Sequence, residues 1–330
     1  MKCAVLGAGA WGTALASLLA DNGHEAKIWC LEPDVADAIS HSHSNPRFLP
    51  GHELNSGLIG TTDKAEALDG AELVLMAAPS HVLREVVSHA RAWVAAGATA
   101  VVATKGIERE SFALMTDVVA QELRGHAVVA LSGPSFAAEV ANRQPTAVVA
   151  ASASASAAAL TQLAFSAPHF RVYSHDDVVG VELGGAIKNV MAVATGISDG
   201  LGLGFNARAA LITRGLAEMM RLGVDMGAHP QTFAGLAGIG DLVLTCTGAL
   251  SRNRQVGLEI GKGATLSEVL AGRETVAEGV VTTESARALA ERRGVEMPIV
   301  TAVHRVLFER QPARWALVEL MGRDLRGERD

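Results

Sequence analysis

The sequence predicts two domains, an α/β domain built on a doubly wound sheet and an all-α domain that follows it. A glycine-rich turn joins a strand to a helix at the start of the chain, apolar runs alternate with helical stretches through the first half, and helical periodicity dominates the second half. We place the domains at residues 1–178 and 179–330, because 330 residues suffice for two hydrophobic cores.

The glycine-rich turn has the context of a dinucleotide-binding site, which predicts a Rossmann-like first domain. The strand Lys2–Leu6 leads directly into a G-x-G-x-x-G motif formed by Gly7, Gly9 and Gly12, and a helical pattern and a second strand, Ala26–Cys30, follow. Gly7 permits a tight turn, Gly9 lets a pyrophosphate approach the backbone, and Gly12 lets the helix pack on the strand. The first turn of the helix then offers N–H groups to the phosphates.

Glu32 follows the second strand, where an acidic side chain can bind the ribose 2′-hydroxyl of the cofactor. The alternative is a solvated glutamate in a turn. Lys27 lies at the start of the strand and Arg47 is far along the sequence, so we expect no cation beside Glu32 to receive a 2′-phosphate. The local sequence therefore favours NAD over NADP.

The remaining strands of the first domain are expected where short apolar runs interrupt the helical stretches, and the alternation predicts parallel strands. These runs are Leu73–Ala77, Ala100–Ala103, Ala127–Leu131, Ala147–Ala150 and Phe170–Tyr173. The Ala/Ser tract at 150–159 is interpreted as a strand end, a serine cap and the start of a helix, because Leu160 and Leu163 follow at helical spacing.

Helices account for the rest of the chain in our prediction. They are Val178–Ser198, Asn206–Leu222, Thr232–Ala237, Arg252–Gly261, Leu266–Leu270, Thr282–Gly294 and Pro298–Glu309. The charged last residues, Arg323–Asp330, are expected to fray.

Lys188 is the first candidate for chemistry. In the segment Gly180–Ser198 only Glu182 and Lys188 are ionisable, and apolar residues surround Lys188 on every face of the predicted helix. A buried ammonium is costly unless it is paired or used, although a lysine stem can also extend to the edge of its helix. Beside a dinucleotide, such a lysine can serve as proton donor and acceptor.

Composition excludes several classes of function. The net charge is −7 and no basic block occurs, which argues against nucleic acid or an anionic membrane as a partner. We find no uninterrupted apolar run long enough for a membrane span, and we interpret the apolar stretch from Lys2 to Ala20 as strand, turn and helix, not as a signal peptide. Cys3, Cys30 and Cys246 are read as buried thiols of a cytoplasmic protein, with no disulfide or metal site.

Polar residues follow two predicted strands at the edge where a doubly wound sheet binds ligands. Lys105 follows the run Ala100–Ala103, and Ser132, Gly133 and Ser135 follow Ala127–Leu131. Each could belong to an ordinary turn. Together, a lysine and a Gly/Ser helix start favour a small anionic substrate.

The helical domain adds a carboxylate and a candidate phosphate site. Asp241 follows a glycine-dense segment and is either a helix cap or a carboxylate that orients and charges a neighbouring lysine. Ser251 is a good N-cap, but Arg252 in the first helical turn opposes the helix dipole. An anion at this helix start would remove the conflict, so we interpret Ser251 and Arg252 as a phosphate-binding site.

The motifs together resemble the bacterial NAD(P)-dependent sn-glycerol-3-phosphate dehydrogenase family over essentially the whole chain. The runs that carry the resemblance are G-A-G-A-W-G-T-A-L-A from Gly7, A-T-K-G from Ala103, S-G-P-S-F-A-A-E from Ser132, G-G-A-I-K-N-V from Gly184, N-A-R-A-A-L-I-T-R-G-L-A-E-M from Asn206, G-I-G-D-L-V-L-T-C-T from Gly238, S-R-N-R from Ser251 and E-G-V-V-T-T from Glu278.

The resemblance implies an enzyme that interconverts glycerol 3-phosphate and dihydroxyacetone phosphate and supplies a precursor of phospholipid synthesis, with Lys188 as catalytic acid and base. The substrate residues it implies are Lys105, Gly133, Ser135, Lys188, Asp241, Ser251, Arg252 and Asn253. The residues it implies at the cofactor, beside the glycines and Glu32, are Ala10, Trp11, Lys105, Ala137, Arg252, Val276 and Glu278. Leu31 departs from the family, which often has Arg or His there to meet a 2′-phosphate, and this also favours NAD.

Two alternatives stay open on the sequence. One is a dehydrogenase of another small hydroxy acid, such as a ketopantoate-like substrate. The other is a protein that senses NAD(H) without turnover, which would be expected to lack the buried lysine and its polar partners. The helical segments have enough apolar surface for a homodimer, although no particular residue argues for one.

Overall fold

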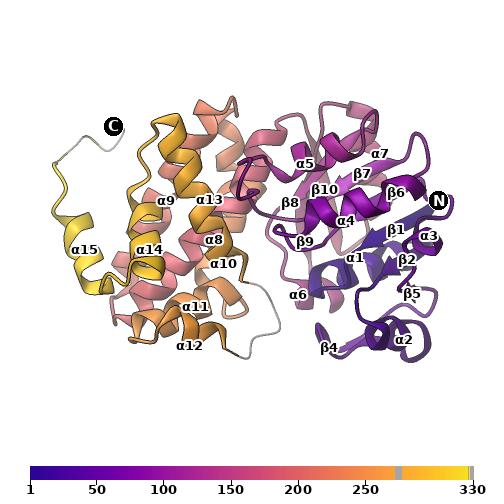
Figure 1. The fold of residues 1–330 in the computed structure, drawn as a ribbon, viewed down its shortest axis with the longest axis horizontal. Helices are drawn as coiled ribbons and strands as arrows, with labels where there is room; N and C mark the ends of the chain where they lie inside the picture. Colours follow the sequence, from indigo (N-terminus) through magenta and orange to yellow (C-terminus); the bar gives the residue numbers. More distant parts are fainter. Residues whose placement is uncertain (272–276, 326, 328–330) are drawn as a thin grey trace.

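The chain forms an α/β domain and a helical domain that lie side by side, with the N-terminus in the first and helix α15 (Ala313–Met321) at the far end of the second (Figure 1). A computed structural model describes residues 1–271, 277–325 and 327. The predicted combination of an α/β domain and an all-α domain is confirmed, while the predicted boundary between residues 178 and 179 stays a prediction.

The α/β domain alternates strands and helices as the apolar runs predict. Its strands are β1 Lys2–Leu6, β2 Glu25–Trp29, β3 Ser44–Asn45, β4 Leu49–Glu53, β5 Ile59–Thr61, β6 Leu73–Met76, β7 Thr99–Val102, β8 Val128–Ser132, β9 Thr146–Ala151 and β10 Phe170–His175. Its helices are α1 Ala10–Asp21, α2 Pro33–Ser42, α3 Lys64–Leu68, α4 Leu83–Ala90, a 3₁₀ turn at Arg91–Trp93, α5 Met115–Glu122, α6 Ala137–Ala141 and α7 Ala155–Phe165.

Eight of these strands form one sheet in the order β10-β9-β8-β7-β6-β1-β2-β5. The prediction of parallel strands is confirmed for every neighbouring pair except β8 and β9, which are antiparallel. Helix α6 has five residues and rises about 7.5 Å, less than half of the about 16 Å that β8 spans. The chain therefore re-enters the sheet from the edge at which β8 ends.

Three short strands escaped the sequence analysis. β3 and β4 form a separate two-stranded sheet, and the three-residue strand β5 adds to the edge of the main sheet. They are too short and too polar to show an alternating pattern. The Ala/Ser tract folds as predicted, since β9 ends at Ala151 and the Ser154 hydroxyl caps α7 by accepting from the Ala157 N–H.

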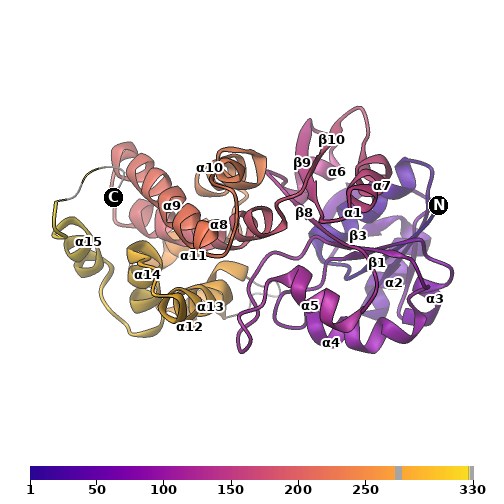
Figure 2. The same cartoon turned by 90° about the horizontal axis from the view of Figure 1, so that it is seen from above.

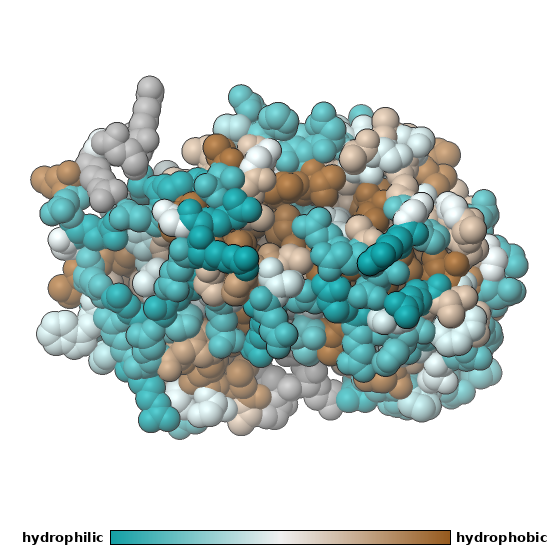
Figure 3. Space-filling view, turned by 45° about the horizontal axis from the view of Figure 1, so that its top comes forward, coloured by the Kyte–Doolittle hydropathy of each residue, from teal (hydrophilic) through white to brown (hydrophobic). Residues whose placement is uncertain are grey.

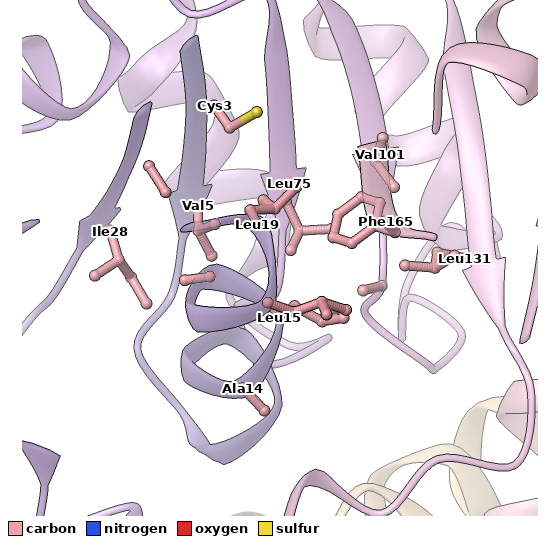
Figure 4. Close-up of a cluster of buried hydrophobic side chains, with 14 of the residues drawn as sticks. Cys3, Val5, Ala14, Leu15, Leu19, Ile28, Leu75, Val101, Leu131 and Phe165 are labelled. Atoms are coloured by element: carbon pink, nitrogen blue, oxygen red, sulfur yellow. The ribbon is translucent and has the colours of Figure 1, made fainter. Parts of the chain in front are cut away.

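Helices cover both faces of the sheet, which makes it doubly wound (Figure 2). On one face, Leu15 and Leu19 of α1 and Phe165 of α7 pack against strand residues such as Leu75 (Figure 4). On the other face, α4 and α5 pack over a second buried cluster. With both faces covered, the central strands β6 and β7 are buried along their whole length.

The helical domain is built around one long helix, α8. Its helices are α8 Val178–Gly200, α9 Phe205–Asp225, α10 Asp241–Thr247, α11 Arg252–Gly261, α12 Leu266–Leu270, α13 Glu278–Arg293, α14 Pro298–Phe308 and α15 Ala313–Met321. Helices α11 and α12 have the predicted bounds. The helix predicted at Thr232–Ala237 is instead a 3₁₀ turn at Pro230–Ala234 followed by a π-helical turn at Leu236–Gly240, and α10 and α15 were not predicted.

Helix α8 runs through the interior of this domain. By length and composition it could cross a membrane, but 89% of its most apolar 18-residue stretch is buried inside the protein. The predicted buried helix is thus confirmed. In the part of the chain that the structure describes, this core helix is the one candidate for a membrane span.

Polar side chains cover much of the face shown in Figure 3, with apolar patches between them.

Close glycine contacts bring α11 onto α8. A Cβ at Gly196 would lie 2.1 Å from the Arg254 carbonyl oxygen, and a Cβ at Gly257 would lie 2.1 Å from the Val193 carbonyl oxygen. The two helix backbones therefore touch directly, and this contact places the start of α11 beside the middle of α8.

Gly12→Ala should destabilise the α/β domain, because a Cβ there would lie 2.0 Å from the Gly7 carbonyl oxygen. We expect a loss of about 1–3 kcal/mol in the free energy of unfolding, measured by denaturant titration. Gly9→Ala is the matched control, since nothing lies within 4 Å of its added methyl group. It should cost less than about 1 kcal/mol, and equal losses in the two variants would contradict the packing role of Gly12.

Candidate active site

Two lysines share one buried carboxylate at the junction of the two domains. Lys188 Nζ lies 2.5 Å from Asp241 Oδ1, and Lys105 Nζ lies 2.8 Å from Asp241 Oδ2. Lys105 Nζ also donates to the Gly133 carbonyl oxygen at 3.2 Å. Asp241 is fully buried and Lys188 is 8% exposed, so Lys188 is not a lysine whose head extends to solvent.

Each member of this cluster comes from a different segment. Lys105 and Gly133 follow β7 and β8 at the carboxyl edge of the sheet, Lys188 lies in α8, and Asp241 begins α10 directly after the π-helical turn. Glycines of α8 allow the approach. A Cβ at Gly184 would lie 2.3 Å from the Ala237 carbonyl oxygen, and one at Gly185 would lie 2.5 Å from Ser132 Oγ.

The cluster lowers the proton affinity of Lys188. Burial is the largest cause and, together with the nearby Lys105 charge, it outweighs the Asp241 carboxylate, so the pKa of Lys188 falls to about 8. Two ammonium groups and one carboxylate leave a formal excess of one positive charge in a site with little water. Such a site can stabilise an anion and can exchange a proton near neutral pH.

The start of α11 lies next to this cluster. Asn253 Nδ2 donates to Asn189 Oδ1 at 2.9 Å, and Asn189 directly follows Lys188. Asn253 Oδ1 accepts from the Gly279 N–H at the start of α13. Ser251 is the N-cap of α11 as predicted, with its hydroxyl accepting from the Arg254 N–H. The segment that the sequence indicated for phosphate binding is therefore fixed to α8 and α13.

Arg252 differs from its neighbours because its guanidinium makes no hydrogen bond or ion pair with any residue that the structure describes. It is the first residue of α11 and is exposed. Its charge acts on the Glu278 carboxyl, whose pKa is raised by burial against the opposing effects of Ser80 and Arg252. Arg252 and the N-terminus of α11 thus present positive charge toward the junction between the domains.

Glu278 connects the two domains. Its carboxylate accepts from the Ser80 N–H at 3.1 Å and from the Ser80 hydroxyl at 2.5 Å. Ser80 follows β6, and Gly106 packs so closely that a Cβ there would lie 2.6 Å from Ser80 Cβ and 3.6 Å from Glu278 Oε2. Because Gly106 follows Lys105, this contact joins the predicted cofactor residue Glu278 to the lysine cluster.

The glycine-rich turn has the geometry that the motif predicts. Gly7 has a φ of 117°, and a Cβ there would lie 2.8 Å from the Ala78 nitrogen. Gly9 is the N-cap of α1 without a side-chain cap, and the space around it is open. Ala10, Trp11 and Ala137 are partly buried and pack against the hydrophobic cluster that includes Leu15 and Phe165.

The other predicted site residues are placed as follows. Gly133 has a φ of 145°, and its carbonyl oxygen accepts from the Ser135 hydroxyl at 3.0 Å. Val276 lies outside the described residues. The roles that the sequence predicts for all these residues stay predictions, but the described ones lie along the carboxyl edge of the sheet and the facing helix starts.

One expectation at the cofactor side was wrong. The sequence analysis expected no cation beside Glu32, yet Arg47 NH1 lies 4.0 Å from Glu32 Oε1. Arg47 is carried there by the turn between β3 and β4, neither of which was predicted. Glu32 itself is the N-cap residue of α2, at the end of β2.

Sequence reasoning also passed over Asn189 and Ser80. Asn189 was within a run that carried the resemblance, and its position directly after Lys188 was an available signal. Ser80 follows an apolar strand at the same edge as Lys105 and could have been found by that rule. Arg47 offered no such signal, because its proximity to Glu32 depends on the path of a polar hairpin.

Comparison with known proteins shows the family of the chain. Residues 2–158 match the family model of the NAD-dependent glycerol-3-phosphate dehydrogenase N-terminus, and residues 177–318 match that of the C-terminus. The chain belongs to the NAD-dependent glycerol-3-phosphate dehydrogenase family.

Relatives of this family match over nearly the whole chain. The glycerol-3-phosphate dehydrogenase [NAD(P)+] of Geobacter sp. strain M21 is 54% identical over 99% of this chain and 98% of its own length. That of Nitratidesulfovibrio vulgaris strain DP4 is 51% identical over 99% of this chain and its full length. A crystal structure of the Coxiella burnetii glycerol-3-phosphate dehydrogenase has a TM-score of 0.94 at 42% identity and covers 98% of this chain and 99% of that chain.

A ketopantoate reductase structure from Ralstonia eutropha is also similar, with a TM-score of 0.62 and 17% identity over 97% of this chain and the whole of that one. At this identity the likeness concerns the fold alone. The family match therefore separates the glycerol-3-phosphate dehydrogenases from the ketopantoate-like alternative that the sequence left open.

Asp241→Asn should strongly destabilise this family member, because it leaves the buried Lys188 and the partly buried Lys105 without a counter-charge. We expect a loss of about 3–5 kcal/mol in the free energy of unfolding at pH 7, measured by denaturant titration. The matched control is Glu259→Gln, which breaks the exposed pair with Lys262 at 3.0 Å. It should change the free energy of unfolding by less than about 1 kcal/mol, and similar losses in both variants would argue against a stabilising Asp241.

Proposed function

We propose that this protein interconverts sn-glycerol 3-phosphate and dihydroxyacetone phosphate with NAD(P)(H), and so supplies glycerol 3-phosphate for phospholipid synthesis. The observation that carries the proposal is the buried Lys188, held by Asp241 at 2.5 Å at the edge of a dinucleotide-binding sheet. The activity for which the Geobacter relative is named supports it, since that relative is 54% identical over 98% of its own length.

The first domain fits a dinucleotide. The first turn of α1 has no side-chain cap, the space around Gly9 is open, and the partly buried Trp11 indole has an Nε1 atom without a partner in the described structure. Gly7, Gly9, Gly12 and the uncapped N–H groups of α1 would hold the pyrophosphate. When bound, the cofactor supplies or accepts a hydride at its nicotinamide C4 carbon.

Lys188 is the proton donor and acceptor in this proposal. In the reducing direction its ammonium donates a hydrogen bond to the ketone oxygen and then the proton itself, which neutralises the charge that develops there. In the oxidising direction neutral Lys188 accepts the hydroxyl proton. Asp241 fixes the position of Lys188, while Lys105 supplies the second positive charge.

Arg252 and the N-terminus of α11 would bind the substrate phosphate. The guanidinium can donate two parallel hydrogen bonds to a phosphate, and the first turn of α11 adds N–H groups and the positive end of its dipole. Because Asn253 ties this helix start to Asn189, a phosphate held here would place the adjacent carbons close to Lys188. Binding energy far from the reacting carbon then orients the ketone.

Glu32 and Leu31 support a preference for NAD(H). The Glu32 carboxylate can accept from ribose hydroxyls, and Leu31, which is 73% exposed, brings no charge to a 2′-phosphate.

Three free, buried cysteines agree with a reducing cytoplasmic location. Exposed apolar residues on α15, among them Trp315, Val318 and Met321, support a homodimer through this end of the helical domain.

Lys188→Ala should lower kcat by about 10²–10⁴-fold, because it removes the proton donor while the cofactor site remains. Stopped-flow absorbance of the reduced nicotinamide gives kcat, and fluorescence titration gives the NADH affinity, which should stay within a few-fold. Lys262→Ala, at an exposed lysine, is the control, and turnover of Lys188→Ala near the wild-type value would exclude the role.

In the wild type, the rate of ketone reduction should fall as pH rises through about 8, where Lys188 loses its proton, and the rate of alcohol oxidation should rise.

Arg252→Ala should mainly weaken binding of phosphorylated substrate. We expect kcat/KM for dihydroxyacetone phosphate to fall about 10–100-fold, as for loss of a hydrogen bond to a charged group. The much lower kcat/KM for dihydroxyacetone should change little. The control is Arg171→Ala at an exposed arginine. Arg254 is unsuitable because it pairs with Asp199, whose side chain is only 7% exposed. An equal loss on both ketones would reject the phosphate site.

A further inference from the structure

The proximity of Arg47 to Glu32 has consequences for cofactor recognition. Arg47 NH1 lies 4.0 Å from Glu32 Oε1, and the side chains are 36% and 24% exposed. An ion pair that is this long and this accessible contributes little to stability. The contact between these two side chains can therefore break when a ligand arrives, at small cost to the fold.

The fold fixes the backbone around Arg47 to the glycine-rich turn. Asn45, which is fully buried, donates from Nδ2 to the Ala8 carbonyl oxygen and to Thr13 Oγ1, both at 2.9 Å. Asn45 Oδ1 accepts from the Phe48 N–H at 3.0 Å, which closes a turn around Arg47. The position of Arg47 is thus set by the same turn and helix that would hold the pyrophosphate.

The side chain of Arg47 is steered as well. Its guanidinium lies 5.3 Å from the centre of the Phe48 ring, a contact that restricts its rotamers without using its hydrogen-bond donors. Glu32 lies between the end of β2 and the start of α2, where an adenosine ribose is expected in this fold. Arg47 is therefore placed beside the ribose 2′ position.

We propose that Arg47 recognises the 2′-phosphate of NADP(H), so that the protein accepts both cofactors despite Leu31. The inference rests on the proposed function and concerns the same cofactor site. With NAD(H), the Glu32 carboxylate accepts a hydrogen bond from the 2′-hydroxyl, and Arg47 stays paired with Glu32. With NADP(H), Arg47 turns to the phosphate, for which its planar guanidinium is suited, and balances the repulsion from Glu32.

Calorimetric titration of the whole protein with NADH and NADPH tests this inference directly. Arg47→Ala should weaken NADPH binding about 10–100-fold and change NADH binding less than about 3-fold. Arg47→Lys should restore part of the NADPH affinity, since it keeps the charge without the planar donor pair. Glu32→Gln should act in the opposite sense, with NADH weakened and NADPH unchanged or strengthened.

Adenosine 2′,5′-bisphosphate and adenosine 5′-phosphate isolate the effect from the nicotinamide half of the cofactor. The preference of the wild type for the bisphosphate should be lost in Arg47→Ala and kept in Arg171→Ala, which removes another exposed arginine of the same domain. Thermal unfolding of each variant verifies that the domain stays folded.

The outcomes separate the two proposals. If the wild type binds NADH but Arg47→Ala weakens both cofactors equally or neither, the Arg47 inference is overturned and the proposed function stands. A wild type that binds NADH but not NADPH likewise overturns only the inference. A folded wild type that binds neither cofactor overturns the proposed function together with it.

Discussion

A buried carboxylate that is shared by two ammonium groups constrains the arrangement of both domains. Asp241 is fully buried, and Lys188 and Lys105 contact its two oxygens at 2.5 and 2.8 Å. None of the three charges could be buried alone without a large desolvation cost. The loop after β7, helix α8 and the start of α10 must therefore meet at one point, and that point is where the sheet edge faces the helical domain.

Helix α8 can come this close to its neighbours because it has glycines at the points of contact. A glycine inside a helix costs about 1 kcal/mol relative to alanine, yet α8 has Gly184, Gly185 and Gly196 at positions where a Cβ would lie within 2.6 Å of a neighbouring atom. This cost is offset by direct packing of α8 against the π-helical turn before α10, against β8 and against α11. Near its start, Glu182 accepts from the Thr116 N–H of α5 at 2.9 Å, and burial raises its pKa to about 7. The helix is thus anchored in both domains on either side of Lys188.

Local pattern was sufficient for the parts of this structure that local forces decide. Apolar runs predicted the long strands, helical periodicity gave the bounds of α11 and α12, and the shortage of charge around Lys188 predicted its burial. The sequence also suggested that Asp241 acts on a lysine, but not that Lys105 shares it. The antiparallel β9, the π-helical turn before Asp241 and the hairpin that carries Arg47 depend on where the chain must return in space, which no single segment encodes.

The two ends of the proposed cofactor site differ in burial and in electrostatic screening. The lysine cluster is dry and tightly coupled, so a change at Asp241 affects Lys188 and Lys105 together. Glu32 and Arg47 are partly solvated and lie 4.0 Å apart, with water to screen them. In the function that we propose, a substitution at Glu32 or Arg47 would change which cofactor binds without altering the proton affinity of Lys188, because the pKa of Lys188 is shifted by its burial and by Asp241 and Lys105. On this proposal, cofactor preference would vary while the acid–base chemistry stays fixed.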